Sequence, residues 1–448
     1  MMKGRVEFFF YVSIGVGMAM ATSSFTMVAG LFEAASAVWI LAGVALSGLF
    51  CMVIALSVGE LASIYPSAPG VRTYFKATFG DRPSLTLVYL YLIFVVLIAG
   101  LEGFVFSQVV SAVFPRTLPM VTITVLIVFV AAINLIGFEL PRGLQIFTTS
   151  ISVLLIVISG ILGLFHAKVS LTEIFSPKDT LRQAMMLPAL AGMSVFLYTG
   201  FEWVTPLGLR AKAYERKVPF SMPATVLVLF LAYSLFVIGT ASQLAPAAIA
   251  RTPVPQIPYF STLYGTMGPY LALLLSVMAI FSTFNAGILG GSQLIFMLAQ
   301  EGQLPEWCGA VSLRTGCPVG AILVLGGLAL TAGAGILLFR LEIVAALIGA
   351  SIMCLIYAAF MVAVLKLRRD KPNVRRPFRT PVFQFVQGAL AVILLIMGVQ
   401  TLLSEPGLGL RCCLGALLSA TLALLLTWRS SSMRMLPSPK TSAAANQL

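Results

Sequence analysis

The sixth long apolar run of this sequence is interrupted by Tyr198-Thr199-Gly200-Phe201-Glu202, and the first is interrupted by Thr22-Ser23-Ser24. Both interruptions fall near the middle of their runs. Small and hydroxyl residues weaken a helix there, and an unsatisfied backbone group at the centre of a bilayer costs several kcal/mol. Such a break persists only beside protein, water or a ligand. Each interruption is therefore a candidate binding position.

The composition places these runs in a membrane. Hydrophobic residues make up 59% of the 448 residues, charged residues make up 10%, and the mean hydropathy is +1.02. A soluble core does not absorb so much apolar sequence. We predict an all-α integral membrane protein of twelve transmembrane helices, each able to cross about 30 Å of hydrocarbon. The predicted spans are 8–30, 36–59, 84–113, 118–137, 144–165, 185–205, 219–244, 267–298, 318–339, 342–366, 381–403 and 409–428.

The spacing of the two interruptions predicts the domain organisation. Interrupted helices at matching positions of two halves indicate the substrate site of a secondary transporter built from inverted repeats. We expect a first repeat of five spans in residues 1–165 and a second in 185–366. Two peripheral helices in 381–428 and a disordered tail at 430–448 follow them.

A competing interpretation makes the first span a cleavable signal peptide. Lys3 and Arg5 precede its apolar stretch, and Ala35-Ser36-Ala37 follows it. The stretch is longer than the roughly 7–15 apolar residues of a signal peptide, which favours a retained span.

The positive charges predict that both termini lie in the cytoplasm, with the chain in the plasma membrane. With the N-terminus inside, 21 of the 28 Lys and Arg residues fall in inner segments, and such a bias sets orientation. The outer ones are Arg116, Lys168, Lys178, Arg182, Arg251, Arg340 and Arg411. Inner loops beside anionic lipid account for the net charge of +13, so nucleic-acid binding is not inferred.

Several loop motifs resemble those of amino acid permeases in the amino acid–polyamine–organocation (APC) superfamily. The first is Gly59-Glu60-Leu61-Ala62 with Tyr65-Pro66-Ser67-Ala68-Pro69-Gly70, where the family usually has Ser-Gly-Gly in place of Ala-Pro-Gly. The others are Gly200-Phe201-Glu202 with Glu215-Arg216-Lys217-Val218-Pro219, Gln300-Glu301-Gly302-Gln303-Leu304-Pro305, and Leu367-Arg368-Arg369-Asp370-Lys371-Pro372 with Arg376-Pro377-Phe378-Arg379. They cover most of the chain in the family's order.

The resemblance implies a LeuT-like fold, with an inverted five-helix repeat plus two peripheral helices, that moves amino acids or related amines by alternating access. It places the substrate at the two interruptions. Amides of the first would hold a substrate carboxylate, carbonyls of the second would accept an ammonium, and Phe196 matches a gating aromatic of the family. The substrate-binding candidates are Thr22, Ser23, Ser24, Glu102, Phe196, Tyr198, Thr199 and Gly200.

The first interruption departs from the family's usual Gly-Ser-Gly. Thr22 and Ser24 replace the two glycines, so either the pocket is smaller or the hydroxyls are ligands themselves. A further alternative is an unbroken helix in which these hydroxyls bond back to the backbone.

Two acids, Glu102 and Glu202, lie at hydrocarbon depth in the third and sixth runs. A charge at a helix centre costs about 2.5–3.5 kcal/mol on insertion scales, so both are functional candidates. Glu202 lies in a family motif and is a candidate protonatable gating residue. A cavity-facing Glu102 would pair with a cationic substrate such as arginine, lysine, ornithine or an amine. Alternatively, Glu102 is protonated and bonded to a neighbouring helix.

The sequence leaves the identity of the coupling ion open. Ser152 aligns with a position where many sodium-independent members carry a lysine, whose ammonium replaces a sodium ion. Ala279, Ser282 and Thr283 resemble the oxygen ligands of sodium-coupled relatives, which suit a hard cation. Proton coupling and obligate exchange are the alternatives, because hydroxyls in membrane helices also serve packing.

Other functional classes receive less support. No paired nucleophile and base is found, so an enzyme is not expected, and no cofactor is expected beyond a sodium ion or proton. The expected partners are the lipid bilayer and an amino acid or amine substrate. A transport-deficient sensor on the same fold is the alternative function.

Overall fold

The computed structural model describes residues 2–66, 70–138, 141–175, 180–207, 214–405 and 407–433, and these residues contain helices and no strand. The first half of the chain forms α1 (Met2–Ala19), α2 (Ser23–Ala34), α3 (Ala37–Ile64), α4 (Gly70–Phe79), α5 (Asp81–Val113), α6 (Pro119–Leu135), α7 (Arg142–Phe165), α8 (Leu171–Ile174), α9 (Thr180–Met185), α10 (Leu187–Tyr198), the 3-10 turn η1 (Phe201–Trp203) and α11 (Val204–Leu207).

The second half begins with α12 (Tyr214–Gln243) and ends with α20 (Gly409–Met433). Between them lie α13 (Pro246–Ala250), α14 (Gln256–Tyr264), the 3-10 turn η2 (Gly265–Met267), α15 (Gly268–Ala279), the π-helical turn η3 (Ile280–Phe284), α16 (Asn285–Gln300), the 3-10 turn η4 (Glu306–Gly309), α17 (Val319–Phe339), α18 (Glu342–Asp370) and α19 (Gln384–Leu402).

Membrane-crossing helices dominate this architecture. Within the described residues, nine helices are long and apolar enough to cross a membrane, and the bent pair α1–α2 makes a tenth. The predicted spans 118–137 and 185–205 correspond to shorter helices, because α6 has 17 residues and α10 has 12. The chain is thus a multi-pass, all-helical membrane protein.

The structure confirms an interruption in each of the two marked runs. The axis bends by 55° between α1 and α2. Ser23 and Ser24 nevertheless lie in the first turn of α2, so the non-helical residues begin earlier than predicted, at Met20. The second interruption lies at Thr199 and Gly200, between α10 and η1.

A third irregularity was not predicted from the sequence. The turn η3 has π-helical geometry and lies in the middle of a long apolar segment, between α15 and α16. Turns of this kind often occur at functional sites. It contacts α1 and α7, so it belongs to the same region as the first interruption.

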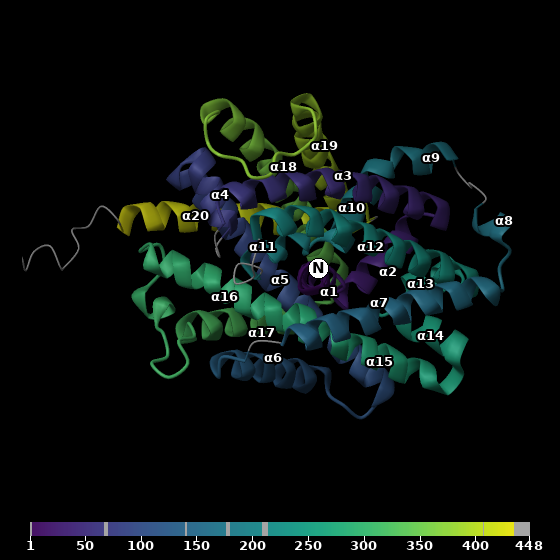
Figure 1. Ribbon diagram of the computed structural model, residues 1–448. Coiled ribbons are helices and arrows are strands. Elements are labelled where there is room, and N and C mark those ends of the chain that lie inside the picture. The colour runs from purple at the N-terminus through teal and green to yellow at the C-terminus, as the bar shows by residue number, and fades with distance from the viewer. Residues whose placement is uncertain are drawn as a thin grey trace, which may run out of the picture.

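Helix α1 lies in the middle of the bundle in Figure 1. It contacts α7, α12, η1 and η3, so both interruptions and the π turn meet in the interior. The short helices α8, α9, α13 and α14 lie at one end of the bundle, and α4 lies toward the opposite end (Figure 1). The described helices of the two connections between predicted spans that begin at 166 and at 245 therefore share one end.

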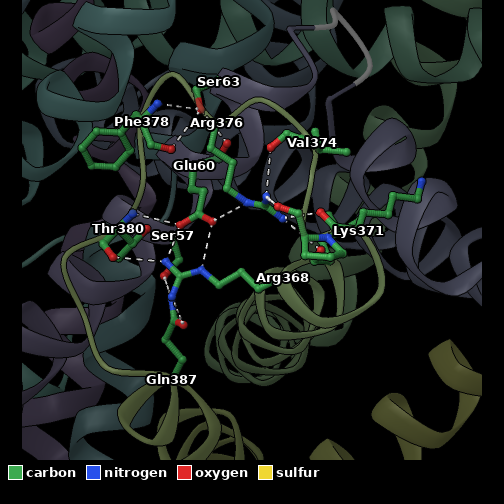
Figure 2. A network of polar contacts seen from close by, with 12 residues as sticks. Ser57, Glu60, Ser63, Arg368, Lys371, Val374, Arg376, Phe378, Thr380 and Gln387 are labelled. Atoms are coloured by element: carbon green, nitrogen blue, oxygen red, sulfur yellow. Dashed lines mark hydrogen bonds and ion pairs between the residues drawn. The ribbon is translucent and has the colours of Figure 1, made fainter.

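A buried ion pair joins α3 to α18 and to the loop that follows α18 (Figure 2). Glu60 accepts a hydrogen bond from Arg368 Nε at 3.0 Å and from the Thr380 amide at 2.8 Å. Arg376 Nε lies 3.5 Å from Glu60 Oε1. The side chain of Glu60 is 1% exposed and that of Arg368 is 5% exposed, so the network is shielded from solvent.

The predicted C-terminal tail is partly helical, and several other residues singled out in the sequence lie outside the described residues. Helix α20 continues to Met433, so residues 430–433 of the predicted tail are helical, and residues 434–448 lie outside the described residues. The motif residues Ser67-Ala68-Pro69 and the basic residues Lys178, Arg210, Lys212, Arg434 and Lys440 also lie outside them.

Glu405, just after α19, gives a prediction about pH. It is 2% exposed, and no hydrogen-bond partner for its carboxylate oxygens is found among the described residues. Burial, together with the nearby Glu33, raises the pKa of Glu405 from 4.5 to about 7. Its contribution to folding stability is therefore fully present below pH 4.5 and is lost as the pH rises through 7. At pH 8 we expect Glu405→Gln to increase the free energy of unfolding by up to about 3 kcal/mol, which would be seen as a higher melting temperature. At pH 4 the variant and the wild type should melt at the same temperature. Equal melting of variant and wild type at pH 8 would contradict this.

Candidate functional site

The first interruption leaves the N-terminal amides of α2 without partners in their own helix. Glu102 of α5 supplies the acceptors. The Thr22 amide donates to Glu102 Oε1 at 2.8 Å, and the Ser23 amide donates to Glu102 Oε2 at 2.9 Å. Glu102 is 1% exposed. A carboxylate of the protein itself thus lies on the amides that the sequence predicted to hold a substrate carboxylate.

Carbonyls of α1 accept hydrogen bonds from side chains of α7, α12 and α2, within the helix at Ser13 and at its end at Ala19. Gln145 Nε2 and Thr149 Oγ1 each donate to Ser13 O at 3.1 Å. Tyr233 Oη donates to Ala19 O at 2.9 Å. Ser24 Oγ donates to the same carbonyl at 3.0 Å, so its hydroxyl bonds back across the break.

The second interruption is held open by a positive φ and by Glu202. Gly200 has φ +127°, a conformation that favours glycine. Glu202 Oε2 accepts the Gly200 amide at 3.1 Å and the Tyr357 hydroxyl at 3.0 Å, and Glu202 Oε1 accepts the Tyr91 hydroxyl at 3.2 Å. Glu202 therefore caps the break from within the bundle.

A cavity of about 60 Å³ lies beside the second interruption and the last turn of α1. Glu102, Thr199, Gly200 and Thr283 line it together with Met18, so the second break, α5, η3 and the end of α1 contribute to its wall. Most of its other lining residues are apolar or aromatic, and Trp203 is one of them. Since a water needs roughly 10–15 Å³ of such space, the cavity has room for a few waters or one small solute.

Five of the eight predicted substrate residues are not among the described residues that line this cavity: Thr22, Ser23, Ser24, Phe196 and Tyr198. The Tyr198 hydroxyl donates to Val44 O of α3 at 2.8 Å. Phe196 is buried against Gly349 of α18 and is not among the described residues that line the cavity. Trp203 and Phe94 are the aromatic rings on the cavity side of the second break and of α5. The gating role of Phe196 stays a prediction.

The residues predicted for ion coupling gather beside α1. Ser282 Oγ donates to Gly17 O at 3.3 Å and lies 3.4 Å from Ala279 O. Thr283 Oγ1 donates to the same Gly17 carbonyl. Ser152 Oγ donates to Thr148 O at 3.1 Å, within its own helix.

Sequence reasoning missed the polar partners of α1 and of the second break. Gln145 and Thr149 are spaced by four residues and Ser152 follows three later, so one face of α7 carries all three, a signal that the sequence already contained. Tyr91, Tyr233 and Tyr357 carried no local signal, because each lies within an ordinary apolar helix.

Two interrupted helices that approach each other beside a cavity inside a multi-pass bundle are typical of a membrane transport protein. The chain belongs to the amino acid permease family, since the model of that family matches residues 7–409. It is therefore a member of the APC superfamily, as the loop motifs indicated.

Three relatives illustrate the similarity. The uncharacterized amino acid permease YecA of Bacillus subtilis is 25% identical over 326 residues, which cover 70% of this chain and 74% of YecA. The serine/threonine exchanger SteT of Bacillus subtilis is 23% identical and covers 65% of this chain and 66% of its own. The aromatic amino acid transport protein AroP of Corynebacterium glutamicum is 24% identical, over 80% of this chain and 82% of AroP.

Solved structures share the fold. The crystal structure of a mutant manganese transporter of Eremococcus coleocola superposes with a TM-score of 0.62 at 10% sequence identity, over 96% of this chain and 94% of that chain. At this identity the similarity concerns the fold alone.

Proposed function

We propose that this protein is a secondary active transporter that moves amino acids or related organic amines across the cell membrane by alternating access. The observation that carries the proposal is one cavity that joins the two interruptions: Thr199 and Gly200 of the second break line it, and so does Glu102, which accepts the amides of the first. The names of SteT and AroP, an exchanger and a transport protein for amino acids, support this substrate range.

The proposed architecture has twelve spans, with inverted repeats in 1–165 and 185–366 and peripheral helices in 381–428. The positions of the two broken helices support it, because they open corresponding halves of the chain. Both termini would lie in the cytoplasm. The excess of Lys and Arg in the predicted inner segments, 21 of 28, supports that orientation.

Accumulation of labelled substrate in proteoliposomes tests the function. We expect a panel of amino acids and their amines to contain a solute that accumulates above its passive leak. A solute that binds but never accumulates, whichever gradient is imposed, would support the sensor on the same fold instead.

We also propose that the oxygens around Gly17 are the coupling-ion site, with sodium as the ion and a proton on Glu202 as the alternative. The carbonyls of Gly17 and Ala279 and the hydroxyls of Ser282 and Thr283 are the hard oxygen ligands that such a cation requires. A bound sodium ion would supply positive charge at the carbonyl end of α1.

Sodium dependence of uptake tests this ion site. We expect uptake to depend on sodium, and Ser282→Ala combined with Thr283→Ala to raise the half-saturating sodium concentration at least tenfold. Ser152→Lys, which adds a fixed ammonium on the neighbouring helix, should remove that dependence or arrest transport. Equal uptake in sodium and choline buffers, at fixed pH and membrane potential, would refute sodium coupling and leave the proton or exchange.

A further inference from the structure

Glu102 occupies the anion position of the first interruption. Its two oxygens accept the amides of Thr22 and Ser23 at 2.8 and 2.9 Å, one oxygen to each amide. A helix N-terminus holds the carboxylate of a ligand in the same way, because its amides point outward and its dipole favours negative charge. Glu102 is fixed on α5, so this carboxylate belongs to the binding cavity permanently.

This arrangement changes what a ligand can bring into the cavity. A free amino acid carries its own carboxylate, which would find both amides occupied and a second carboxylate beside it. Two carboxylates side by side repel each other strongly where water is excluded. A ligand with only an ammonium meets an attractive partner instead.

The rest of the cavity suits a cation. Glu102 is the one acidic or basic side chain among the described residues that line it, and no ion pair of Glu102 with a Lys or Arg side chain is found among the described residues. Phe94, Trp203 and Phe284 also line the cavity, and aromatic faces attract ammonium groups. One carboxylate matches one ammonium, and the volume of about 60 Å³ limits the ligand to a small molecule.

We propose that the substrate is a small organic monoamine without a carboxylate, recognised by Glu102, whose side chain replaces the substrate carboxylate on the amides of Thr22 and Ser23. This inference rests on the proposed function, since it names the solute that the same cavity takes. It narrows the amino acids and amines considered above to the amines.

Matched pairs of solutes test the proposal on the wild-type protein. Each pair consists of an amino acid and the amine left when its carboxylate is removed: alanine and ethylamine, serine and ethanolamine, valine and isobutylamine, phenylalanine and 2-phenylethylamine. Both members carry an ammonium and the same side chain, so a difference in affinity reports the carboxylate alone. Calorimetry or ligand-induced thermal stabilisation of the purified protein, at fixed pH and sodium concentration, gives the affinities.

We expect the amine to bind at least tenfold more tightly than its amino acid in at least one pair, with no pair showing the reverse order. Amino acids that bind more tightly than their amines would overturn the proposal. Failure of the wild-type protein to bind either member of every pair would overturn it too.

Variants of Glu102 provide a second, independent measurement. Glu102→Gln keeps the shape of the side chain but removes its charge, so amine affinity should fall at least tenfold. Glu102→Ala frees the two amides and should raise the affinity for the amino acid of the pair. The control is Glu306→Gln, which removes an exposed acid in η4 and should leave both affinities unchanged. Unchanged amine affinity in a folded Glu102→Gln protein would contradict the proposal.

Uptake measurements separate this inference from the proposed function. Amines that bind but do not accumulate in proteoliposomes would leave the ligand class intact and remove the transport activity. Amino acids that accumulate while amines neither bind nor accumulate would leave transport intact and remove the ligand class.

Discussion

Gly200→Ala is expected to reduce uptake to the background of empty proteoliposomes. A Cβ at Gly200 would lie 2.9 Å from Ala19 N and 2.9 Å from Met18 C, which are backbone atoms of α1 and cannot rotate away. The residue also has φ +127°, where a side chain adds about 1–3 kcal/mol of strain. One methyl group would therefore push the two interruptions apart at the cavity wall.

A matched glycine separates the close contact from the strain. Gly302 has φ +71°, and a Cβ there would meet nothing within 4 Å. Gly302→Ala should therefore lower the melting temperature slightly and preserve uptake. Gly200→Ala protein should still be recovered folded, by size-exclusion chromatography and thermal melting, while failing to transport. Uptake by Gly200→Ala equal to that of Gly302→Ala would contradict the close approach of the two breaks.

The sequence was sufficient to predict features that arise from local composition. The interruptions at Thr22 and Gly200 follow from small and hydroxyl residues inside apolar runs, and the membrane spans follow from the length of those runs. Glycine at position 200 was informative because only a backbone without a Cβ fits both the positive φ and the approach of α1.

The contacts between distant segments were not predictable in the same way. Glu102 is about eighty residues away in sequence from the two amides that donate hydrogen bonds to it. Hydrophobic periodicity shows which face of a helix is apolar, but it does not show which helix packs against that face. Sequence reasoning therefore led to two separate expectations, an amide site for a carboxylate and an acid for a cation. The structure shows that these two groups bind each other. The proposal of an amine substrate depends on this contact, which the sequence does not reveal.

Gln145 shows the same limit on the opposite side of α1. The sequence drew attention to Ser152, because a lysine was expected there, and the missing positive charge suggested an ion. In the structure Gln145 and Thr149, on the same face of α7, donate hydrogen bonds to Ser13 O. These neutral donors bond a carbonyl within α1, six residues before the helix ends, and the ion proposed above lies nearer that end, at Gly17.

The buried ion pair at Glu60 leads to the second large expected effect. Glu60→Gln would leave Arg368, which is 5% exposed, without its carboxylate, and Arg376 would lose the same partner. Removing one partner of a buried pair typically costs about 3–5 kcal/mol, because the remaining charge stays out of water. We expect a melting temperature lower by several degrees, measured on the purified protein. Glu306→Gln, which neutralises an exposed acid, should melt like the wild type.

A double-mutant cycle distinguishes the pair from a general loss of packing. Arg368→Gln alone leaves the buried Glu60 with the Thr380 amide and the more distant Arg376 as its remaining partners, so it too should be destabilising. Combining it with Glu60→Gln removes both charges together, and the double variant should lose less stability than the two single changes added. A coupling above about 1 kcal/mol is expected for residues in such direct contact. Additive losses would mean that Glu60 and Arg368 act independently, and that the loop after α18 is held on α3 by its backbone contacts with Ser63 and Leu56 instead.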